Sequence, residues 1–246
     1  MDRMLFIGMS GAKETLLSQG LNINNLANVS TTGFRADLAQ ARSMPVFGPG
    51  LPTRAYAMTE RYRTNFEAGP LNTTGRDLDV AIKGEGWLTV QGRDGTEAYS
   101  RAGDFHITAN GQLVTGTGLP VIGNGGPIAI PPAEGVSIGV DGTITIKPVG
   151  QGAEALVVVD RIKLVNPPTQ DLEKGEDGLV RLKDGTVAAA DASVQVISGA
   201  LEGSNVSPAL ALTTMISNQR HYEMQIKVMK IAKENDERAA QLLRMS

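Results

Sequence analysis

A chain of 246 residues with a net charge of -3 is long enough to bury a hydrophobic core and to form one or two domains with a helical extension. Its 23 basic and 26 acidic side chains are interspersed without a basic stripe, which argues against binding of nucleic-acid phosphates. The absence of cysteine excludes disulfides, thiol nucleophiles and thiolate metal sites.

The N-terminal segment is predicted to be one long helix over residues 3–28. Apolar and small side chains recur there in alternating steps of four and three, which is the heptad spacing of helices that pair along a seam. The seam residues are Leu5, Met9, Ala12, Leu16, Gln19, Ile23 and Leu26. This pattern predicts a partner helix elsewhere in the chain.

The first residues do not resemble a secretory signal. Their apolar run is about six residues long, Lys13 and Glu14 follow closely, and no small-residue cleavage site is present. No apolar run in the chain approaches the roughly 18 residues of a membrane-spanning helix. We therefore expect no membrane span, and either a cytoplasmic protein or one exported without a cleaved signal peptide.

The middle of the chain has a different character. Residues 34–77 contain four prolines and few long apolar runs, so we expect an extended or irregular connecting region with a candidate strand over 56–63. From residue 78 onward, short runs of strand-forming residues alternate with turn residues. Asn-Gly or Asp-Gly pairs at 94–95, 110–111, 141–142 and 184–185 separate such runs. These pairs predict hairpins with type I′ turns.

The C-terminal segment is predicted to be a second long helix. Ser207 is a good N-cap, Pro208 suits the first helical position, and the helix is expected to reach about Leu243. A second heptad seam runs along it, formed by Leu212, Met215, Gln219, Tyr222, Ile226 and Met229. Seams at both ends of the chain predict that the two terminal helices pair with each other.

Together these patterns predict a mainly β protein with a two-helix terminal stem. Residues 1–33 and 202–246 would form the coiled-coil-like stem, and residues 34–77 the connecting region. Residues 78–201 would form an all-β outer domain, either a sandwich or barrel-like.

We expect no metal, cofactor or catalytic site. Only two histidines are present, with no cysteine near them, and no glycine-rich segment continues into the Lys-Ser/Thr of a phosphate loop. One alternative is a protein that binds or cleaves cell-wall carbohydrate, with Asp77, Asp79 and Glu85 as acids and Trp87 as a stacking platform. Another is a monomeric β protein whose helices pack back on it.

Several segments resemble the bacterial flagellar rod and hook proteins. The terminal signatures are residues 24–35 (NNLANVSTTGFR), 201–206 (LEGSNV) and 220–224 (RHYEM), and the central ones are 78–88 (LDVAIKGEGWL) and 99–105 (YSRAGDF). The resemblance spans nearly the whole chain in collinear order. The stretch after residue 35 lacks the Phe-rich segment of the distal rod and hook proteins, so the proximal rod type is the more similar one and the distal rod type is the alternative.

The resemblance implies a structural subunit of the periplasmic rod, exported without a cleaved signal peptide by the flagellar type III apparatus. Its implied partners are further copies of itself, the other proximal rod proteins, the distal rod protein, the export apparatus and the rod cap. It also implies two sets of functional residues. Assembly through the stem would use Leu5, Met9, Leu16, Ile23, Leu26, Leu212, Met215, Tyr222, Ile226 and Met229. The bend from stem to body would use Asn24, Asn25, Asn28, Gly33 and Phe34.

Overall fold

The computed structural model describes residues 4–47, 55–150 and 156–244. The chain forms two compact units. The first, which we call the stem unit, consists of Met1–Asn28, Ala36–Asn65 and Val206–Ser246. The second, the body unit, consists of Val29–Arg35 and Phe66–Asn205. The chain therefore crosses between the units four times. The three-part division expected from the sequence stays a prediction, and the units are described in their own bounds.

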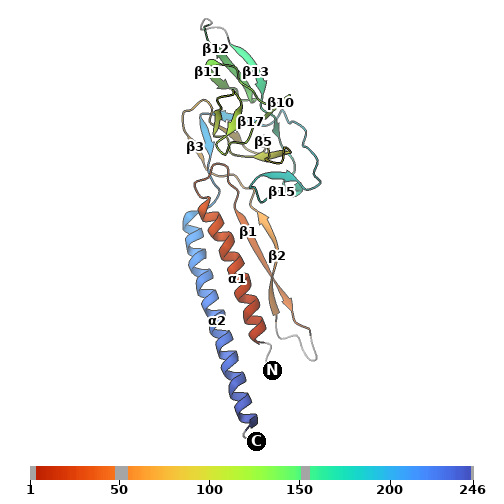
Figure 1. Ribbon diagram of the computed structural model, residues 1–246, viewed down its shortest axis with the longest axis vertical. Helices are drawn as coiled ribbons and strands as arrows, with labels where there is room; N and C mark the ends of the chain where they lie inside the picture. The colour runs from red at the N-terminus through yellow and green to blue at the C-terminus, as the bar shows by residue number, and fades with distance from the viewer. Residues whose placement is uncertain (1–3, 48–54, 151–155, 245–246) are drawn as a thin grey trace. The chain divides into compact units, whose positions relative to one another are not determined.

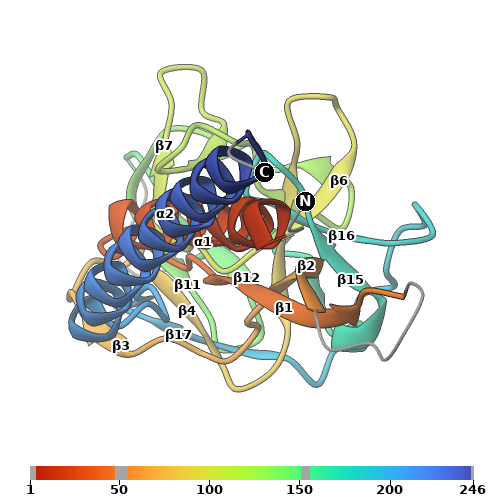
Figure 2. The same cartoon turned by 90° about the horizontal axis from the view of Figure 1, so that it is seen from below.

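The stem unit contains the two helices of the molecule's described part, α1 (Met4–Ala27) and α2 (Pro208–Arg244). They lie side by side (Figures 1 and 2). Asn22 Nδ2 donates to the Ala211 carbonyl at 2.7 Å, and Asn218 Nδ2 donates to Ser18 Oγ at 3.2 Å. The earlier residue of α1, Ser18, thus contacts the later residue of α2, Asn218. The two helices are therefore antiparallel. The predicted pairing of the terminal helices is confirmed.

The start of α2 follows from local sequence. The Ser207 hydroxyl accepts the Leu210 N–H at 3.4 Å, and the Ser207 carbonyl accepts the Ala211 N–H at 2.9 Å. A serine at this position satisfies an N–H that would otherwise lack an intrahelical partner, and Pro208 has no N–H to satisfy. The predicted cap is confirmed.

An antiparallel ribbon completes the stem unit. It consists of β1 (Asp37–Pro45) and β2 (Ala55–Thr64), which confirms the predicted strand over 56–63. Two side chains of α1 hold the ribbon. Ser10 Oγ donates to the Ala57 carbonyl at 2.9 Å, and Asn25 bonds both the carbonyl and the N–H of Asp37, at 2.7 and 2.9 Å.

The body unit is built from small antiparallel sheets. The largest has the order β14-β5-β6-β16-β15, and a three-stranded sheet has the order β11-β12-β13. Among the described residues these sheets do not close into a barrel. The predicted mainly β class with two terminal helices is nevertheless confirmed.

The strands of the five-stranded sheet are β14 (Leu164–Val165), β5 (Trp87–Gln91), β6 (Glu97–Ser100), β16 (Val180–Leu182) and β15 (Leu172–Lys174). The three-stranded sheet contains β11 (Ala133–Ile138), β12 (Thr143–Pro148) and β13 (Val157–Arg161). The remaining pairs are β4 (Val80–Lys83) with β17 (Gln195–Ser198), β3 (Leu71–Thr73) with β18 (Ala200–Glu202), β7 (Phe105–Ile107) with β8 (Leu113–Thr115), and β9 (Ile122–Gly123) with β10 (Gly126–Pro127). One 3₁₀ turn, η1, spans Thr169–Asp171.

The hairpin turns differ from the predicted type I′. No non-glycine residue in the described ranges has a positive φ, so only the glycine of each pair is left-handed. In the β5–β6 hairpin, the Gly95 N–H donates to the Gly92 carbonyl at 3.0 Å and the Gly92 N–H donates to the Thr96 carbonyl at 2.8 Å. This is a type I turn followed by a left-handed glycine. A positive φ raises the backbone energy of any residue with a Cβ. In this turn Gly95 has the positive φ, and Asp94 before it keeps a negative one.

The hairpin predicted at residues 184–185 is wrong. The Gly185 N–H closes a turn on the Leu182 carbonyl, but residues 186–194 form no strand. Strand β16 pairs instead with β15 and β6. The turn signal is local, whereas the choice of neighbouring strand depends on sheet topology.

The two units differ in how they bury apolar side chains. The body unit contains all of the large buried apolar residues, the most enclosed of which are Tyr99, Phe105, Leu88, Leu113, Ile128, Ile144 and Ile162. Within the described ranges of the stem unit, the buried apolar residues are four alanines: Ala12, Ala36, Ala211 and Ala232. The described part of the stem unit thus has no core of large side chains.

The turn aspartates make the body unit sensitive to acid. The Thr143 hydroxyl donates to Asp141 at 2.7 Å and the Thr143 N–H donates at 3.1 Å, and these bonds hold the pKa of Asp141 below its ordinary value of 3.8. The pKa values of Asp94, Asp184 and Asp191 are lowered by similar bonds. Since the folded state binds these protons more weakly than the unfolded chain, the stabilisation is present above pH 3.8 and lost as the pH falls through the lowered pKa values.

Replacement of Asp94, Asp141, Asp184 and Asp191 together by Asn should therefore reduce the loss of stability in acid. Asparagine still accepts the backbone N–H but does not titrate in this range. Urea unfolding at about pH 3 and about pH 6 would measure the difference, since linkage relates it to proton uptake. Equal losses in the variant and the unsubstituted protein would contradict this assignment.

Candidate assembly surface

The apolar residues assigned to assembly lie largely on the surface of the stem unit. Met9, Leu16 and Ile23 are 55%, 54% and 51% exposed. Leu5, Leu212 and Ile226 are also exposed, whereas Leu26, Met215, Tyr222 and Met229 are half-buried. Such a concentration of exposed large apolar side chains is typical of an interaction surface. Their role in assembly stays a prediction.

Small and polar residues bring α1 against α2; Ala12 belongs to the predicted seam, whereas Gly8, Gly11 and Asn22 do not. Gly8 and Ala12 are buried, and a Cβ atom at Gly8 would lie 2.8 Å from Met229 Cγ. A Cβ atom at Gly11 would lie 2.9 Å from the Gln225 side chain. The helices therefore approach closely where α1 has almost no side chain. The residues that the seam prediction missed are Gly8 and Gly11, together with Asn22, which is buried against α2.

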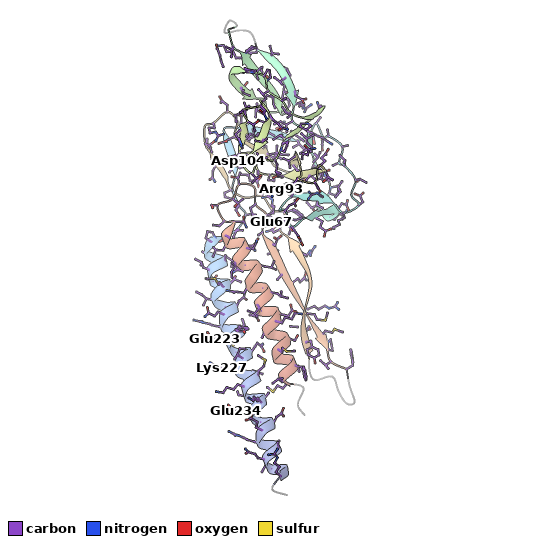
Figure 3. The ribbon with its side chains drawn as sticks, viewed as in Figure 1. Glu67, Arg93, Asp104, Glu223, Lys227 and Glu234 are labelled. Atoms are coloured by element: carbon purple, nitrogen blue, oxygen red, sulfur yellow. The ribbon has the colours of Figure 1, made fainter. Side chains whose placement is uncertain are left out.

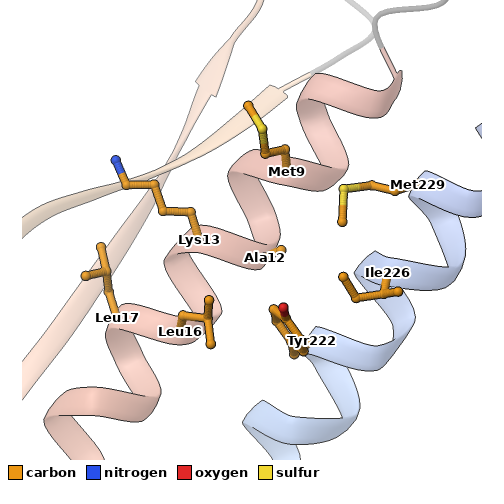
Figure 4. A pocket seen from close by; sticks show the side chains of 8 residues that line it. All are labelled: Met9, Ala12, Lys13, Leu16, Leu17, Tyr222, Ile226 and Met229. Atoms are coloured by element: carbon orange, nitrogen blue, oxygen red, sulfur yellow. The ribbon is translucent and has the colours of Figure 1, made fainter.

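An apolar groove runs between the two helices, with a volume of about 480 Å³. Figure 4 shows the side chains that line it: Met9, Ala12, Lys13, Leu16, Leu17, Tyr222, Ile226 and Met229. Five of the predicted assembly residues meet here. Lys13 is the only charged residue in the lining. We call this the helix groove.

A second groove lies between α1 and β2 and has a volume of about 650 Å³. Its lining consists of Phe6, Met9, Ser10, Lys13, Glu14, Leu17, Tyr56, Ala57 and Met58. The two grooves share Met9, Lys13 and Leu17, which are four residues apart and so form one ridge along α1. We call the exposed side of α1 that carries both grooves the open face; its residues are Leu5, Phe6, Met9, Lys13, Leu16, Leu17 and Ile23.

The predicted bend residues separate into two groups. Asn24, Asn25 and Asn28 belong to the stem unit, where the buried Asn25 holds Asp37 and the Asn28 N–H donates to the Asn24 carbonyl at 3.2 Å. Gly33 and Phe34 belong to the body unit. Their shared role in a bend stays a prediction, but the body-unit members lie beside a feature that the sequence did not reveal.

That feature is a buried ionic cluster around Glu202, whose side chain is 1% exposed. Arg35 Nη2 lies 2.6 Å from Glu202 Oε1, and Arg101 Nη1 lies 2.8 Å from Oε2. The Gly69 N–H also donates to Oε1, at 2.9 Å. Both guanidinium groups lie over the ring of Trp87, at 5.7 and 5.3 Å from its centroid. The ring's negative face partly offsets the excess positive charge.

The cluster gathers the segments through which the chain enters and leaves the body unit. Arg35 ends one segment, Gly69 lies near the start of the next, and Glu202 lies near the end of the last. The backbone adds to this: the Gly33 N–H donates to the Glu202 carbonyl at 2.8 Å. Gly33 has φ of 67°, and a Cβ there would lie 2.3 Å from the Arg101 carbonyl carbon, so only glycine fits.

Burial lowers the pKa of Arg101, and the nearby Glu202 carboxylate opposes that shift. An arginine remains protonated even after a substantial decrease, so the cluster contains two cations and one anion. Removing a carboxylate from between two buried cations leaves both without compensation, which is the costly case for a buried ion pair. Glu202 is therefore the residue on which the cluster depends.

The alternative carbohydrate site is not supported by the geometry. Trp87 is buried beneath the two guanidinium groups and packs edge-on against Phe66 at 5.7 Å, so its face is not available for a sugar ring. Asp79 is buried, with Arg76 at 3.5 Å. Among the described residues, no group of three or more His, Cys, Asp or Glu side chains could hold a metal ion. No helix in the described ranges is both long and apolar enough to span a membrane.

Comparison with known proteins identifies one group of relatives. A family model described as the flagellar basal body rod FlgEFG protein C-terminal region matches residues 197–242, and one described as the flagellar hook protein FlgE/F/G D1 domain matches residues 81–146. The chain is 43% identical to the flagellar basal-body rod protein FlgF of Salmonella typhimurium and 42% identical to that of Escherichia coli. Each comparison covers all of this chain and all of the relative. It is 32% identical to the flagellar basal-body rod protein FlgG of Agrobacterium fabrum, over 94% of this chain and 96% of that protein.

Substitution of Glu202 by Gln should destabilise the body unit by about 3–5 kcal/mol, because two buried guanidinium groups lose their anion. Urea unfolding followed by fluorescence of Trp87, the only tryptophan, would report directly on the cluster.

The matched control is Glu134→Gln, which removes one partner of the exposed Lys147–Glu134 ion pair at 2.9 Å. That change should cost less than about 1 kcal/mol, as is usual for surface pairs. Similar losses in the two variants would show that Glu202 is not the anchor of the cluster.

Proposed function

The chain belongs to the family of flagellar basal-body rod and hook proteins, and we propose that it is a structural subunit of the rod, of the FlgF type. The full-length identity to FlgF proteins supports this type. The FlgG relative matches at lower identity and over less of the chain, so the distal rod alternative is the weaker one. The chain therefore functions in the flagellum, by assembling with other rod proteins.

The observation that carries this function is the composition of the stem unit's interior. Four alanines are its buried apolar residues within the described ranges, while large apolar side chains cover its surface. Burial of a large apolar side chain contributes about 1.5–3 kcal/mol to the free energy of folding or association. In the isolated stem most of these side chains are not buried, so most of this stabilisation is absent. Neighbouring subunits supply the missing contacts, so assembly completes the packing of the stem.

The kind of contact also suits a rod. In this proposal a neighbour docks on the open face of α1 with a different surface of its own. Such head-to-tail contacts repeat without closing and generate a helical filament. The chain acts mechanically in this proposal and is not an enzyme; the covered Trp87 is consistent with that.

The finer assignments rest on family membership. We place the subunit in the proximal rod in the periplasm, reached through the flagellar type III export apparatus without a cleaved signal peptide. The export apparatus, the rod cap, the other proximal rod proteins and the distal rod protein are its partners in this proposal. A stem without a large core is compatible with passage through a narrow export channel, because little stabilisation opposes its unfolding.

Leu16→Asp and Ile226→Asp should each abolish incorporation into the rod and swimming. Both side chains line the helix groove, and a carboxylate there would have to be buried without a partner when a neighbour docks. Swimming in soft agar and the content of purified basal bodies would be measured.

Val187→Asp, which adds the same charge at an exposed valine of the body unit, should leave both readouts unchanged. Normal thermal unfolding of the body unit in all three proteins would show that the loss is not a folding defect. Swimming of the Leu16 and Ile226 variants would refute the proposed role of the groove.

Segment-resolved hydrogen exchange of the purified chain at low concentration should separate the two units. Amides of α1 and α2 should exchange rapidly, because their helices lack large buried contacts, whereas those of β5, β6 and β12 should be protected. Strong protection of both helices in the monomer would instead show a stem that is stable before assembly.

A further inference from the structure

The end of the body unit, residues 194–205, completes two of its small sheets. Among the described residues, β17 is the strand that pairs with β4 in one two-stranded sheet, and β18 pairs with β3 in another. Val194 and Val196 enter the main hydrophobic cluster and are 3% and 1% exposed. At the other end, Asn205 Nδ2 donates at 3.0 Å to the carbonyl of Glu67, which is labelled in Figure 3. We call residues 194–205 the closing segment.

The closing segment also carries the carboxylate of the ionic cluster. Without Glu202, Arg35 and Arg101 would be buried with no anion beside them. Three of their N–H groups already lack a hydrogen-bond partner, namely Nε and Nη1 of Arg35 and Nε of Arg101. Burial of an uncompensated cation is strongly unfavourable. Docking of the closing segment and burial of the two arginines are therefore coupled.

The rest of the body unit keeps most of its packing without this segment. Neither the five-stranded sheet nor the three-stranded sheet contains a residue from 194–205. The two smaller hydrophobic clusters, around Trp87 and around Val90, contain none of its residues either. The main cluster loses two of its buried members, Val194 and Val196. A form in which the closing segment is detached therefore retains both large sheets.

The contacts of the closing segment join residues that are far apart in the sequence. Glu202 bonds to Arg101 and Arg35 across separations of 101 and 167 residues, whereas β5 and β6 are neighbours along the chain. Closing a long loop costs more chain entropy than closing a hairpin. Detachment of the segment therefore returns more entropy than the opening of a local hairpin.

We propose that the closing segment detaches from the body unit as one piece, before the large sheets unfold. The Glu202 side chain holds it in place, because both arginines and the Gly69 N–H bond to that carboxylate. Helix α2 begins shortly after the segment, at Pro208. The covalent path from α2 into the body unit thus runs through a segment that opens separately from the rest.

Hydrogen exchange of the full-length chain in low concentrations of urea tests this proposal. Four N–H groups join the closing segment to the rest of the body unit, those of Gly33, Val196, Gly199 and Gly203. The comparison amides are those of Thr89, Val121 and Ile128, which bond elsewhere in the body unit.

The four amides of the closing segment should show a lower free energy of opening than the comparison amides. They should also show a smaller urea slope, since the slope scales with the surface that an opening exposes. Equal free energies and equal slopes in the two groups would overturn the proposal. The urea slopes are measured on the unsubstituted chain, so they decide the question even if a variant does not fold.

Two Glu→Gln variants supply a matched comparison. Glu97, in β6, lies 2.8 Å from Lys163, and both side chains are mostly buried. This ion pair is retained when only the closing segment detaches. Glu97→Gln should therefore accelerate exchange of the comparison amides by roughly tenfold or more. It should leave the exchange of the four closing-segment amides unchanged.

Glu202→Gln should instead accelerate both groups of amides by roughly 100- to 1,000-fold, because it destabilises the native state relative to every open form. Equal acceleration of both groups by Glu97→Gln would show that the body unit opens as a whole and would overturn the proposal. Unchanged exchange of the four amides in Glu202→Gln would overturn it too, since the carboxylate would then not hold the segment.

Discussion

The carboxylate of Glu202 is the group on which the packing of the separate chain segments of the body unit depends. Each charge that leaves water loses several kcal/mol of solvation, and a buried cation persists only if an anion and hydrogen bonds compensate it. Two arginines from distant parts of the sequence share one carboxylate above one tryptophan ring, although Arg35 Nε and Nη1 and Arg101 Nε are buried without a hydrogen-bond partner. Because Gly33 and Gly69 also bond to Glu202, the segments that enter and leave the body unit are fixed at a common point.

Each taken by itself, the two units pack their apolar side chains in opposite ways. The body unit encloses aromatic and aliphatic side chains among short sheets, with turns held by aspartate side chains. It contains hydrophobic clusters of its own. In the described ranges of the stem unit the fully buried apolar side chains are all alanines, and its large apolar side chains are exposed or half-buried. This division suits a subunit whose body is complete before assembly and whose stem is completed by its neighbours.

The choice of small residues between α1 and α2 explains why the stem surface is so apolar. Gly8, Gly11 and Ala12 allow the two helices to approach closely. Most of the leucines and isoleucines of the pair are therefore not buried between the helices. Those residues form the open face on α1, and others such as Leu210, Ile216 and Ile231 are exposed on α2. A helix pair with a large-residue seam would be more stable alone and would offer less to a neighbour.

The sequence by itself determined the two terminal helices, their pairing, the cap at Ser207, the strand over 56–63 and the mainly β middle. These features depend on local capping and turn chemistry and on apolar periodicity, which act over a few residues. The tertiary structure alone decided three other features. The contact side of α1 includes Gly8 and Gly11 besides the predicted Ala12, because closeness of approach depends on both helices at once. The turn at 184–185 ends no hairpin, because strand partners are chosen across the sheet. The cluster of Arg35, Arg101 and Glu202 joins residues far apart in the chain, and only the folded body unit brings these charges together.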